Sequence, residues 1–367
     1  MTNLNRRQTL GLTLGLSALG VSPMAKAAFP RRTQELTFPI LLSANENPWG
    51  PGPKAREAIE SAIKNSSRYG LNWPSKLTAA IAAKENVSID QVILGSGSGE
   101  LLNIIALAWC QKGVVTCGWP TFNQLMNFAE RVGGNARKVP LNGQLVHDLS
   151  ALSAASGHDT NTLYICNPNN PTGTVVAAAP LKEFCIAMAK RTLVVVDEAY
   201  LDLANPRSTS SMVDLTRSET NLIVLRTFSK IHGLAGLRIG YGISTPDIIK
   251  KMKQYQLVFP NILGLAAATA SLGDTEFLKY SRNQLLTDRA RVCTACDQLG
   301  LQYVPSEANF IFIKVGISLD EFRAKMKIRG IQVGRNFEPL TEYCRVTIGT
   351  TAETSAFIKA LKEIIKS

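Results

Sequence analysis

The segment Leu193-Val194-Val195-Val196-Asp197-Glu198-Ala199-Tyr200 decides the fold. Four consecutive strongly apolar residues are typical of a central strand that is buried on both faces of a parallel sheet. A carboxylate at the tip of such a strand is costly unless it meets a cation. The segment therefore predicts a buried sheet and a cationic partner at the carboxyl end of one of its strands.

Short apolar runs on both sides of this segment alternate with helical stretches. They lie at 91–94, 114–117, 162–166, 222–225 and 237–243. This alternation predicts an α/β fold with a mostly parallel sheet covered by helices. After Pro246 the pattern becomes helical, and then gives strand-like segments at 309–315 and 343–348, a helix at 319–329 and a terminal helix. This part predicts a second, smaller α+β domain.

The resulting domain prediction has four parts. They are a signal peptide at 1–27, an N-terminal segment at 28–65 that joins the small domain, a large domain at 66–270 and a small domain at 271–367. The length suits two domains, since a domain usually has roughly 100 to 200 residues.

Composition excludes several classes of protein. With 45% hydrophobic and 19% charged residues, the 367-residue chain is too apolar for intrinsic disorder. Forty Lys and Arg against 28 Asp and Glu give a net charge of +12, but they are spread along the chain, which argues against a nucleic-acid partner. His147, His158 and His232 lack metal-ligand spacing, so no metal site is expected. Cys293 and Cys296 are expected to line one helix face as structural thiols.

The first 27 residues predict export. Arg6 and Arg7 precede a short apolar run at 10–21, and Ala25-Lys26-Ala27 forms a small-residue cleavage site. The paired arginines favour a twin-arginine signal, and the run is too short to span a bilayer. We expect cleavage after Ala27, no stable membrane anchor afterwards and a periplasmic location. The chain would be cytoplasmic if the leader is not functional.

Three further segments follow apolar runs, where ligands bind in open α/β sheets. Gly95-Ser96-Gly97-Ser98-Gly99-Glu100 could bind a phosphate at a helix N-terminus, although it also suits a plain turn. Asn167-Pro168-Asn169-Asn170-Pro171-Thr172-Gly173 forms a rigid turn that presents an amide to a ligand. Thr227-Phe228-Ser229-Lys230 is followed by Arg238. A lysine near other cations has a lowered pKa and can form a Schiff base with a carbonyl.

Taken in order, these motifs resemble those of fold-type I aminotransferases that use pyridoxal 5'-phosphate (PLP), and within them the histidinol-phosphate aminotransferase family. The resemblance extends from residues 42–48 to residues 345–350. It implies a fold like that of aspartate aminotransferase, in which the large domain binds PLP. It also implies ping-pong transamination between an L-amino acid and a 2-oxo acid through a Schiff base on Lys230. The family further implies a homodimer with shared active sites.

The resemblance also assigns roles to individual residues. Lys230, Asp197 and Tyr200 would be catalytic, with Asp197 on the ring nitrogen of PLP and Tyr200 on its ring oxygen. The other cofactor-binding residues would be Gly97, Ser98, Gly99, Phe122, Asn170, Thr227, Ser229, Arg238 and, from the neighbouring subunit, Tyr69. The substrate-binding residues would be Asn47, Asn170, Arg335 and Arg345, with Arg345 on the α-carboxylate.

One departure leaves the substrate open. The family's distal arginine, which helps to hold the substrate's phosphate, falls on Gly334, and Arg335 follows one position later. On a strand-like segment this shift would turn the side chain to the opposite face. A periplasmic location also argues against histidinol phosphate, because histidine biosynthesis is cytoplasmic.

Two alternatives to transamination remain. A lyase or decarboxylase on the same scaffold would break a different bond at the α-carbon, and a non-catalytic binding protein would keep only the fold. The carboxylate contact of Arg345 favours transamination over the first alternative. The intact set of lysine, aspartate and tyrosine argues against the second.

Overall fold

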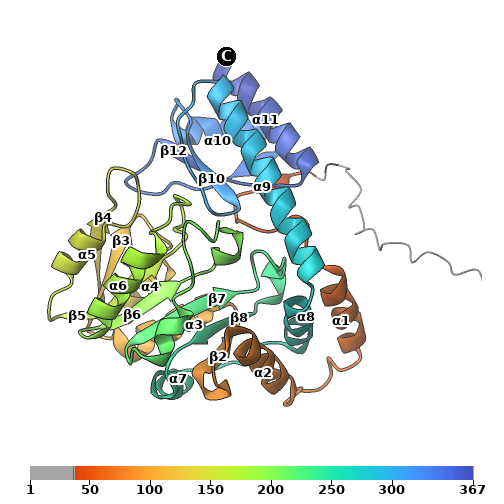
Figure 1. The fold of residues 1–367 in the computed structure, drawn as a ribbon. Coiled ribbons are helices and arrows are strands. Elements are labelled where there is room, and N and C mark those ends of the chain that lie inside the picture. Colours follow the sequence, from red (N-terminus) through yellow and green to blue (C-terminus); the bar gives the residue numbers. More distant parts are fainter. Residues whose placement is uncertain (1–35, 37, 367) are drawn as a thin grey trace, which may run out of the picture. The chain divides into compact units, whose positions relative to one another are not determined.

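The computed structural model describes residue 36 and residues 38–366, which belong to one compact unit, Arg32–Ser367 (Figure 1). The leader at 1–27 lies outside the described residues, so its signal, its cleavage site and the location that it implies stay predictions. The predicted domain limits also stay predictions.

The largest element of the structure is a seven-stranded sheet. In spatial order its strands are β2 (Val92–Gly95), β8 (Gly240–Ile243), β7 (Leu222–Thr227), β6 (Leu193–Asp197), β5 (Thr160–Cys166), β3 (Val114–Trp119) and β4 (Asn135–Pro140). β8 pairs antiparallel with β2 and β7, and the other pairs are parallel. The predicted α/β fold with a mostly parallel sheet is confirmed.

Alternate residues of β6 belong to two different cores. Val194 and Val196 lie in a cluster with residues of α2 (Trp73–Glu85), α6 (Ala178–Ala189) and α8 (Ile262–Leu272). Leu193 and Val195 lie in a cluster with residues of α3 (Ser98–Trp109), α4 (Gln124–Arg131) and α7 (Pro246–Lys253). Helices therefore cover both faces, which is why the sequence of the strand is continuously apolar.

A second group of elements comes mostly from the C-terminal third of the chain (Figure 1). β9 (Tyr303–Val304), β10 (Phe310–Lys314) and β12 (Tyr343–Thr347) form an antiparallel sheet, and β1 (Ile40–Leu42) pairs in parallel with β11 (Ile331–Val333). The helices of this group are α9 (Thr275–Gln298), α10 (Leu319–Ile328) and α11 (Thr351–Lys366). The remaining helices are α1 (Pro53–Ile63) and α5 (Leu149–Ala155), with 3-10 turns at Ile89–Gln91, Leu201–Leu203, Val213–Arg217 and Ala235–Leu237.

The cysteines, the potential metal ligands and the helices of the described part of the chain bear on disulfide bonding, metal binding and membrane insertion. All seven cysteines are free thiols, and Cys293 and Cys296 both pack into the core around β10 from α9. Among residues 36 and 38–366, no group of three or more His, Cys, Asp or Glu side chains could hold a metal ion. None of the helices described is both long and apolar enough to cross a membrane.

Candidate active site

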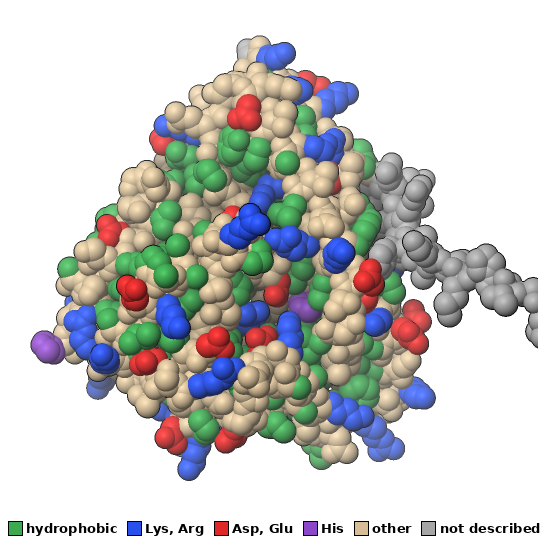
Figure 2. Space-filling view, in the orientation of Figure 1, with side chains coloured by type: hydrophobic (Ala, Val, Ile, Leu, Met, Phe, Trp, Pro, Cys, Tyr) green, Lys and Arg blue, Asp and Glu red, His purple; other side chains and the backbone are tan. Residues whose placement is uncertain are grey.

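A cavity of about 450 Å³ brings together residues from motifs that lie far apart in the sequence. Among its lining residues are the predicted site residues Ser98, Gly99, Phe122, Asn170, Asp197, Tyr200, Thr227, Ser229, Lys230, Arg238, Arg335 and Arg345. Figure 2 shows Lys and Arg side chains gathered across the middle of the visible face, between the central sheet and the C-terminal elements. The cavity is therefore suited to an anionic ligand.

Lys230 lies three residues beyond the end of β7 and points its amine into the cavity. The amine nitrogen Nζ donates to the backbone carbonyls of Ala44 at 3.2 Å and Asn45 at 3.1 Å, and lies 5.5 Å from the ring centroid of Tyr200. Burial, with help from the nearby charge of Arg345, lowers the pKa of Lys230 to about 8. A useful fraction of the amine is therefore uncharged, and nucleophilic, near neutral pH.

Asp197 is the last residue of β6, and its carboxylate is fixed by two donors. Oδ2 accepts from the hydroxyl of Tyr164 at 2.9 Å, and Oδ1 accepts from the amide of Ala199 at 3.2 Å. Burial raises the pKa of Asp197 to about 6, and the two donors oppose that rise. Each oxygen keeps acceptor capacity, so the carboxylate can still bind a cationic N–H group.

The hydroxyl of Tyr200 accepts hydrogen bonds from two side-chain amides. It accepts from Nδ2 of Asn45 at 3.0 Å and from Nδ2 of Asn170 at 3.4 Å. Burial raises the pKa of Tyr200 above its usual range. The hydroxyl therefore keeps its proton and can donate it to a ligand oxygen.

The turn between β2 and α3 forms a cup for an anion. Gly97 caps α3 with a φ of +79°, and a Cβ there would overlap Nη2 of Arg238. Arg238 also donates through Nη1 to the hydroxyl of Ser229 at 3.3 Å, and Thr227 donates to the same hydroxyl at 2.9 Å. A helix N-terminus, hydroxyls and a guanidinium thus converge, which is the chemistry that a phosphate requires.

Two arginines contact the same aromatic ring. The guanidinium carbon of Arg345 lies 4.9 Å from the ring centroid of Phe337, and that of Arg335 lies 4.4 Å from it. Arg345 is buried, donates to Oδ1 of Asn170 at 2.6 Å and to the carbonyl of Ser43, and has no partner for its Nε. Arg335 is exposed at the cavity. The cavity therefore offers a deep and a shallow site for negative charge.

The expected turn of Arg335 to the opposite face is wrong. β11 ends at Val333, so the alternation of a strand no longer governs residue 335. Gly334 packs against the backbone of Arg345 and donates its amide to the Arg345 carbonyl at 2.9 Å. A side chain at 334 would collide with that backbone, whereas the side chain at 335 lines the cavity.

The sequence of this chain is similar to those of known aminotransferases. Residues 39–361 match the model of the aminotransferase class I and II family. The chain belongs to this family. The histidinol-phosphate aminotransferase of Moorella thermoacetica is 38% identical to this aminotransferase over 331 residues, which cover 89% of this chain and 85% of the relative. A histidinol-phosphate aminotransferase of Brevibacillus brevis is 36% identical over 338 residues, which cover 91% of this chain and 93% of the relative.

A solved structure shares the fold of this aminotransferase over almost its whole length. The crystal structure of histidinol-phosphate aminotransferase from Sinorhizobium meliloti in complex with pyridoxal-5'-phosphate is 29% identical, with a TM-score of 0.84. The match covers 93% of this chain and 99% of that chain.

Three predicted residues of this aminotransferase lie outside the cavity lining: Gly97, which caps α3 behind Ser98, and Asn47 and Tyr69. Nδ2 of Asn47 donates to the carbonyl of Ile231 and the hydroxyl of Ser281, both at 2.7 Å, so its amide fixes the chain instead of facing a ligand. Tyr69 is 99% exposed and does not line the cavity of its own chain.

Sequence reasoning also missed lining residues. Asn45, Gln124 and Phe337 face the cavity, and Gln124 donates to the carbonyl of Gly99 at 2.8 Å. Asn45 stands two positions before Asn47 in a motif already recognised, and its φ of +55° separates it from the regular backbone. The sequence carries no comparable signal for Phe337.

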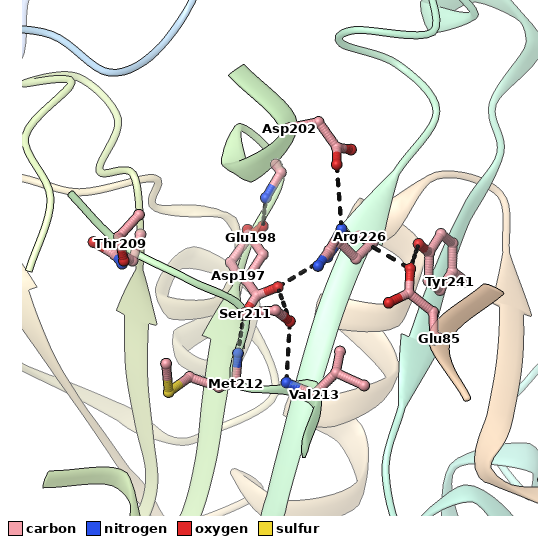
Figure 3. Close-up of polar contacts among 12 residues, drawn as sticks. Glu85, Asp197, Glu198, Asp202, Thr209, Ser211, Met212, Val213, Arg226 and Tyr241 are labelled. Atoms are coloured by element: carbon pink, nitrogen blue, oxygen red, sulfur yellow. Dashed lines mark hydrogen bonds and ion pairs between the residues drawn. The ribbon is translucent and has the colours of Figure 1, made fainter. Parts of the chain in front are cut away.

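Arg226, on the neighbouring strand β7, anchors the loop after β6 (Figure 3). Arg226 of β7 donates through Nε to Glu198 at 2.8 Å and lies 3.5 Å from Asp202. Glu198 also accepts from the hydroxyl of Ser211 at 2.8 Å and the amide of Met212 at 2.6 Å. Asp197 and Tyr200 thus project into the cavity from a segment that Arg226 holds through Glu198, which lies between them, and Asp202, which follows them.

Proposed function

We propose that this aminotransferase exchanges an amino group between an L-amino acid, or a phosphorylated amino alcohol such as histidinol phosphate, and a 2-oxo acid in a PLP-dependent ping-pong reaction. The observation that carries the proposal is the amine of Lys230, with its lowered pKa, in one cavity with the buried carboxylate of Asp197 and the anion cup at Gly97.

The residues present fit PLP part by part. The cup formed by Gly97, Ser98, Ser229 and Arg238 fits the phosphate group, and a side chain at position 97 would fill it. Asp197 fits the ring nitrogen, and the hydroxyl of Tyr200 fits the ring oxygen. When bound, PLP supplies an electron sink for the carbon that carries the amino group.

Three basic side chains would have different roles in the reaction. Lys230 would hold the cofactor covalently through its amine. The same amine, oriented by two backbone carbonyls, can take up or return a proton at Nζ when it is free. Arg345 holds a carboxylate, or a phosphate in the same place, through its partnerless Nε and its terminal nitrogens. Arg335 adds a second positive charge at the mouth, which favours donors with a further anionic group.

The experiment is a single half-reaction with purified protein and PLP. Histidinol phosphate and individual L-amino acids are added without a 2-oxo acid, while absorbance follows the conversion of the cofactor from its aldehyde to its amine form. Conversion with release of the matching carbonyl compound supports the proposal. Release of carbon dioxide or ammonia supports a lyase instead, and absence of any cofactor band supports a binding protein.

A matched pair of variants tests the substrate class. We expect Arg335→Ala to raise the KM for a phosphorylated donor by about 10- to 100-fold, since a hydrogen bond to a charged group contributes about 1.5–3 kcal/mol. Arg329→Ala is the control, because Arg329 is bonded to Glu363 on the surface and does not line the cavity. Equal KM values for the two variants would remove Arg335 from the substrate site.

We also propose that two copies form a dimer with shared sites. Tyr69 and Leu71 are almost fully exposed, and Leu257 and Phe259 are exposed on the α7–α8 connection. Gly70 lies against Ile262 at the start of α8, so these two connections are neighbours. Such a group of exposed apolar side chains is typical of an interaction surface, and the resemblance places Tyr69 at the phosphate of the neighbouring subunit.

For the leader, we propose twin-arginine export to the periplasm. The support is the sequence of residues 1–27 alone. Fractionation of cells that make the full chain should give a periplasmic protein that begins at Ala28. Replacing Arg6 and Arg7 by Lys should keep the protein in the cytoplasm, and an uncleaved cytoplasmic wild type would contradict the proposal.

A further inference from the structure

Tyr164 donates a hydrogen bond to the cavity carboxylate from behind. Its side chain is fully buried, and its hydroxyl lies 2.9 Å from Oδ2 of Asp197. The register of β5 and β6 places Cys166 opposite Asp197. Since side chains alternate along a strand, Tyr164 shares a face with Cys166 and reaches Asp197 diagonally.

The packing around Tyr164 requires its ring but not its hydroxyl. Its ring packs in the apolar cluster that contains Val195, Leu225 and residues of α3. A phenylalanine would fill the same space, and a buried hydroxyl is costly without a partner. The hydroxyl meets the thiol of Cys166 and the carboxylate of Asp197, and the carboxylate, which faces the cavity, is the stronger acceptor of the two.

The charge of Asp197 depends on few groups. Tyr164 and Cys166 face this carboxylate from β5. The amide of Ala199 and the side chain of Tyr200 face it from its own loop, and Lys230 faces it from the segment after β7. Burial raises the pKa of Asp197, and Tyr164 is the first of the groups that lower it. Loss of the hydroxyl would therefore raise this pKa further, toward neutral pH. A protonated carboxyl can no longer pair with a cationic ring nitrogen.

We propose that Tyr164 is a positioning residue of this aminotransferase, which acts through Asp197 by keeping that carboxylate ionised and turned toward the ring nitrogen of the cofactor. The inference rests on the proposed PLP chemistry. It assigns a function to a side chain that touches neither substrate nor cofactor.

The test compares two buried tyrosines of the same sheet. Tyr164→Phe removes the donor to Asp197. Tyr241→Phe also removes a hydroxyl that donates to a carboxylate, since Tyr241 donates to Oε1 of Glu85 at 2.9 Å. Neither Tyr241 nor Glu85 lines the cavity. Three properties are measured for each holoenzyme: the dissociation constant of PLP, the ¹⁵N signal of PLP labelled at its ring nitrogen, and the acid limb of the kcat/KM profile.

We expect Tyr164→Phe to weaken PLP binding about tenfold and to move the acid limb up by about one pH unit, as loss of one hydrogen bond to a charged group predicts. The ¹⁵N signal should shift toward that of an unprotonated ring, and kcat should fall more than KM changes. Tyr241→Phe should leave the ring signal and the acid limb in place. If the two variants behave alike, the hydroxyl of Tyr164 is merely structural and the inference is overturned.

A double variant tests the path of the effect. In an Asp197→Asn background, Tyr164→Phe should change PLP affinity little, because the group through which it acts is already neutral. An undiminished loss would contradict the inference. Tyr164→3-fluorotyrosine keeps the shape and strengthens the donor, so it should move the acid limb down even if the phenylalanine variant folds poorly. Failure of the wild type to bind PLP would instead overturn the proposed function.

Discussion

At the residue scale, the protonation of Lys230 sets when its amine can react. The amine must be neutral to attack a carbonyl, and its pKa is lowered to about 8. Because the charged form dominates below that value, we expect the rate of PLP incorporation into the cofactor-free protein to rise with pH and to level off above about pH 8. Stopped-flow absorbance across the pH range measures this midpoint.

The midpoint should respond to Arg345 in a defined direction. After burial, Arg345 is the largest cause of the lowered pKa. Replacing it in Arg345→Gln removes a like charge, so the charged amine becomes less unfavourable and the midpoint should move up. Arg329→Gln, on the surface, should leave the midpoint unchanged. A wild-type midpoint near the ordinary lysine value would contradict the account of this site.

At the scale of elements, the β2–α3 turn depends on the absence of a side chain at Gly97. Gly97→Ala would place a methyl group against Arg238 and force a non-glycine residue to a φ of +79°. Gly133→Ala is a matched control, because Gly133 has a φ of +89° but open space around its Cβ position. We expect both variants to lose about 1–2 kcal/mol of unfolding free energy through the backbone.

PLP affinity should separate these two variants. Gly97→Ala should bind PLP at least about tenfold more weakly, since it displaces a guanidinium from the phosphate cup, whereas Gly133→Ala should bind it normally. Titration of the cofactor-free variants with PLP gives the comparison. Equal affinities would show that the cup does not hold the phosphate.

The connection between β6 and β7 makes a separate prediction about stability. Arg226→Met leaves the buried carboxylate of Glu198 without its cation, so we expect a loss of about 3–5 kcal/mol in the free energy of unfolding. Burial already raises the pKa of Glu198, and loss of Arg226 raises it further. The deficit should therefore shrink as the pH falls and Glu198 becomes neutral.

Arg137→Met is the control for the Arg226 prediction. Arg137 pairs with Asp159 on the surface at 2.7 Å, where an ion pair contributes about 0–1 kcal/mol. Denaturant unfolding at two pH values measures both variants. Equal losses for Arg226→Met and Arg137→Met would contradict a buried anchor beneath the loop.

Strands that are buried on both faces could be predicted from the sequence, and so could the amphipathic helix α10, but an exposed edge strand could not. β6 is continuously apolar and was expected, as were β5 and β7. β4 was missed because it is an edge strand with the polar sequence Asn-Ala-Arg-Lys-Val-Pro. β8 begins at Gly240, later than expected, since a 3-10 turn at Ala235–Leu237 and the left-handed backbone of Arg238 precede it.

At the scale of the whole molecule, the candidate site combines predictable and unpredictable residues. Asp197 ends β6, and Asn170 and Lys230 follow β5 and β7, so the topology of the sheet brings them to one edge. Phe337 and Asn45 reach the cavity from the group of elements around β10, and no local pattern gives their distance from the sheet. The position of Arg335 likewise required knowing where β11 ends.

The proposed dimer makes the last prediction, because shared sites allow two inactive subunits to complement each other. Lys230→Ala removes the reactive amine, and Tyr69→Ala removes a side chain that would serve the partner's site. When equal amounts of the two variants are unfolded and refolded together, random pairing makes half of the dimers hybrid. Each hybrid has one intact site, so about a quarter of the wild-type activity should return.

Sedimentation of the wild type and of both variants is the control for the mixing experiment. The wild type and both variants should sediment as dimers, since Tyr69 lies on an exposed connection and supplies only part of the apolar surface near Leu257 and Phe259. Dimers without recovered activity would place Tyr69 outside the partner's site. A monomeric wild type would remove the shared site altogether, because the exposed Tyr69 does not line the cavity of its own chain.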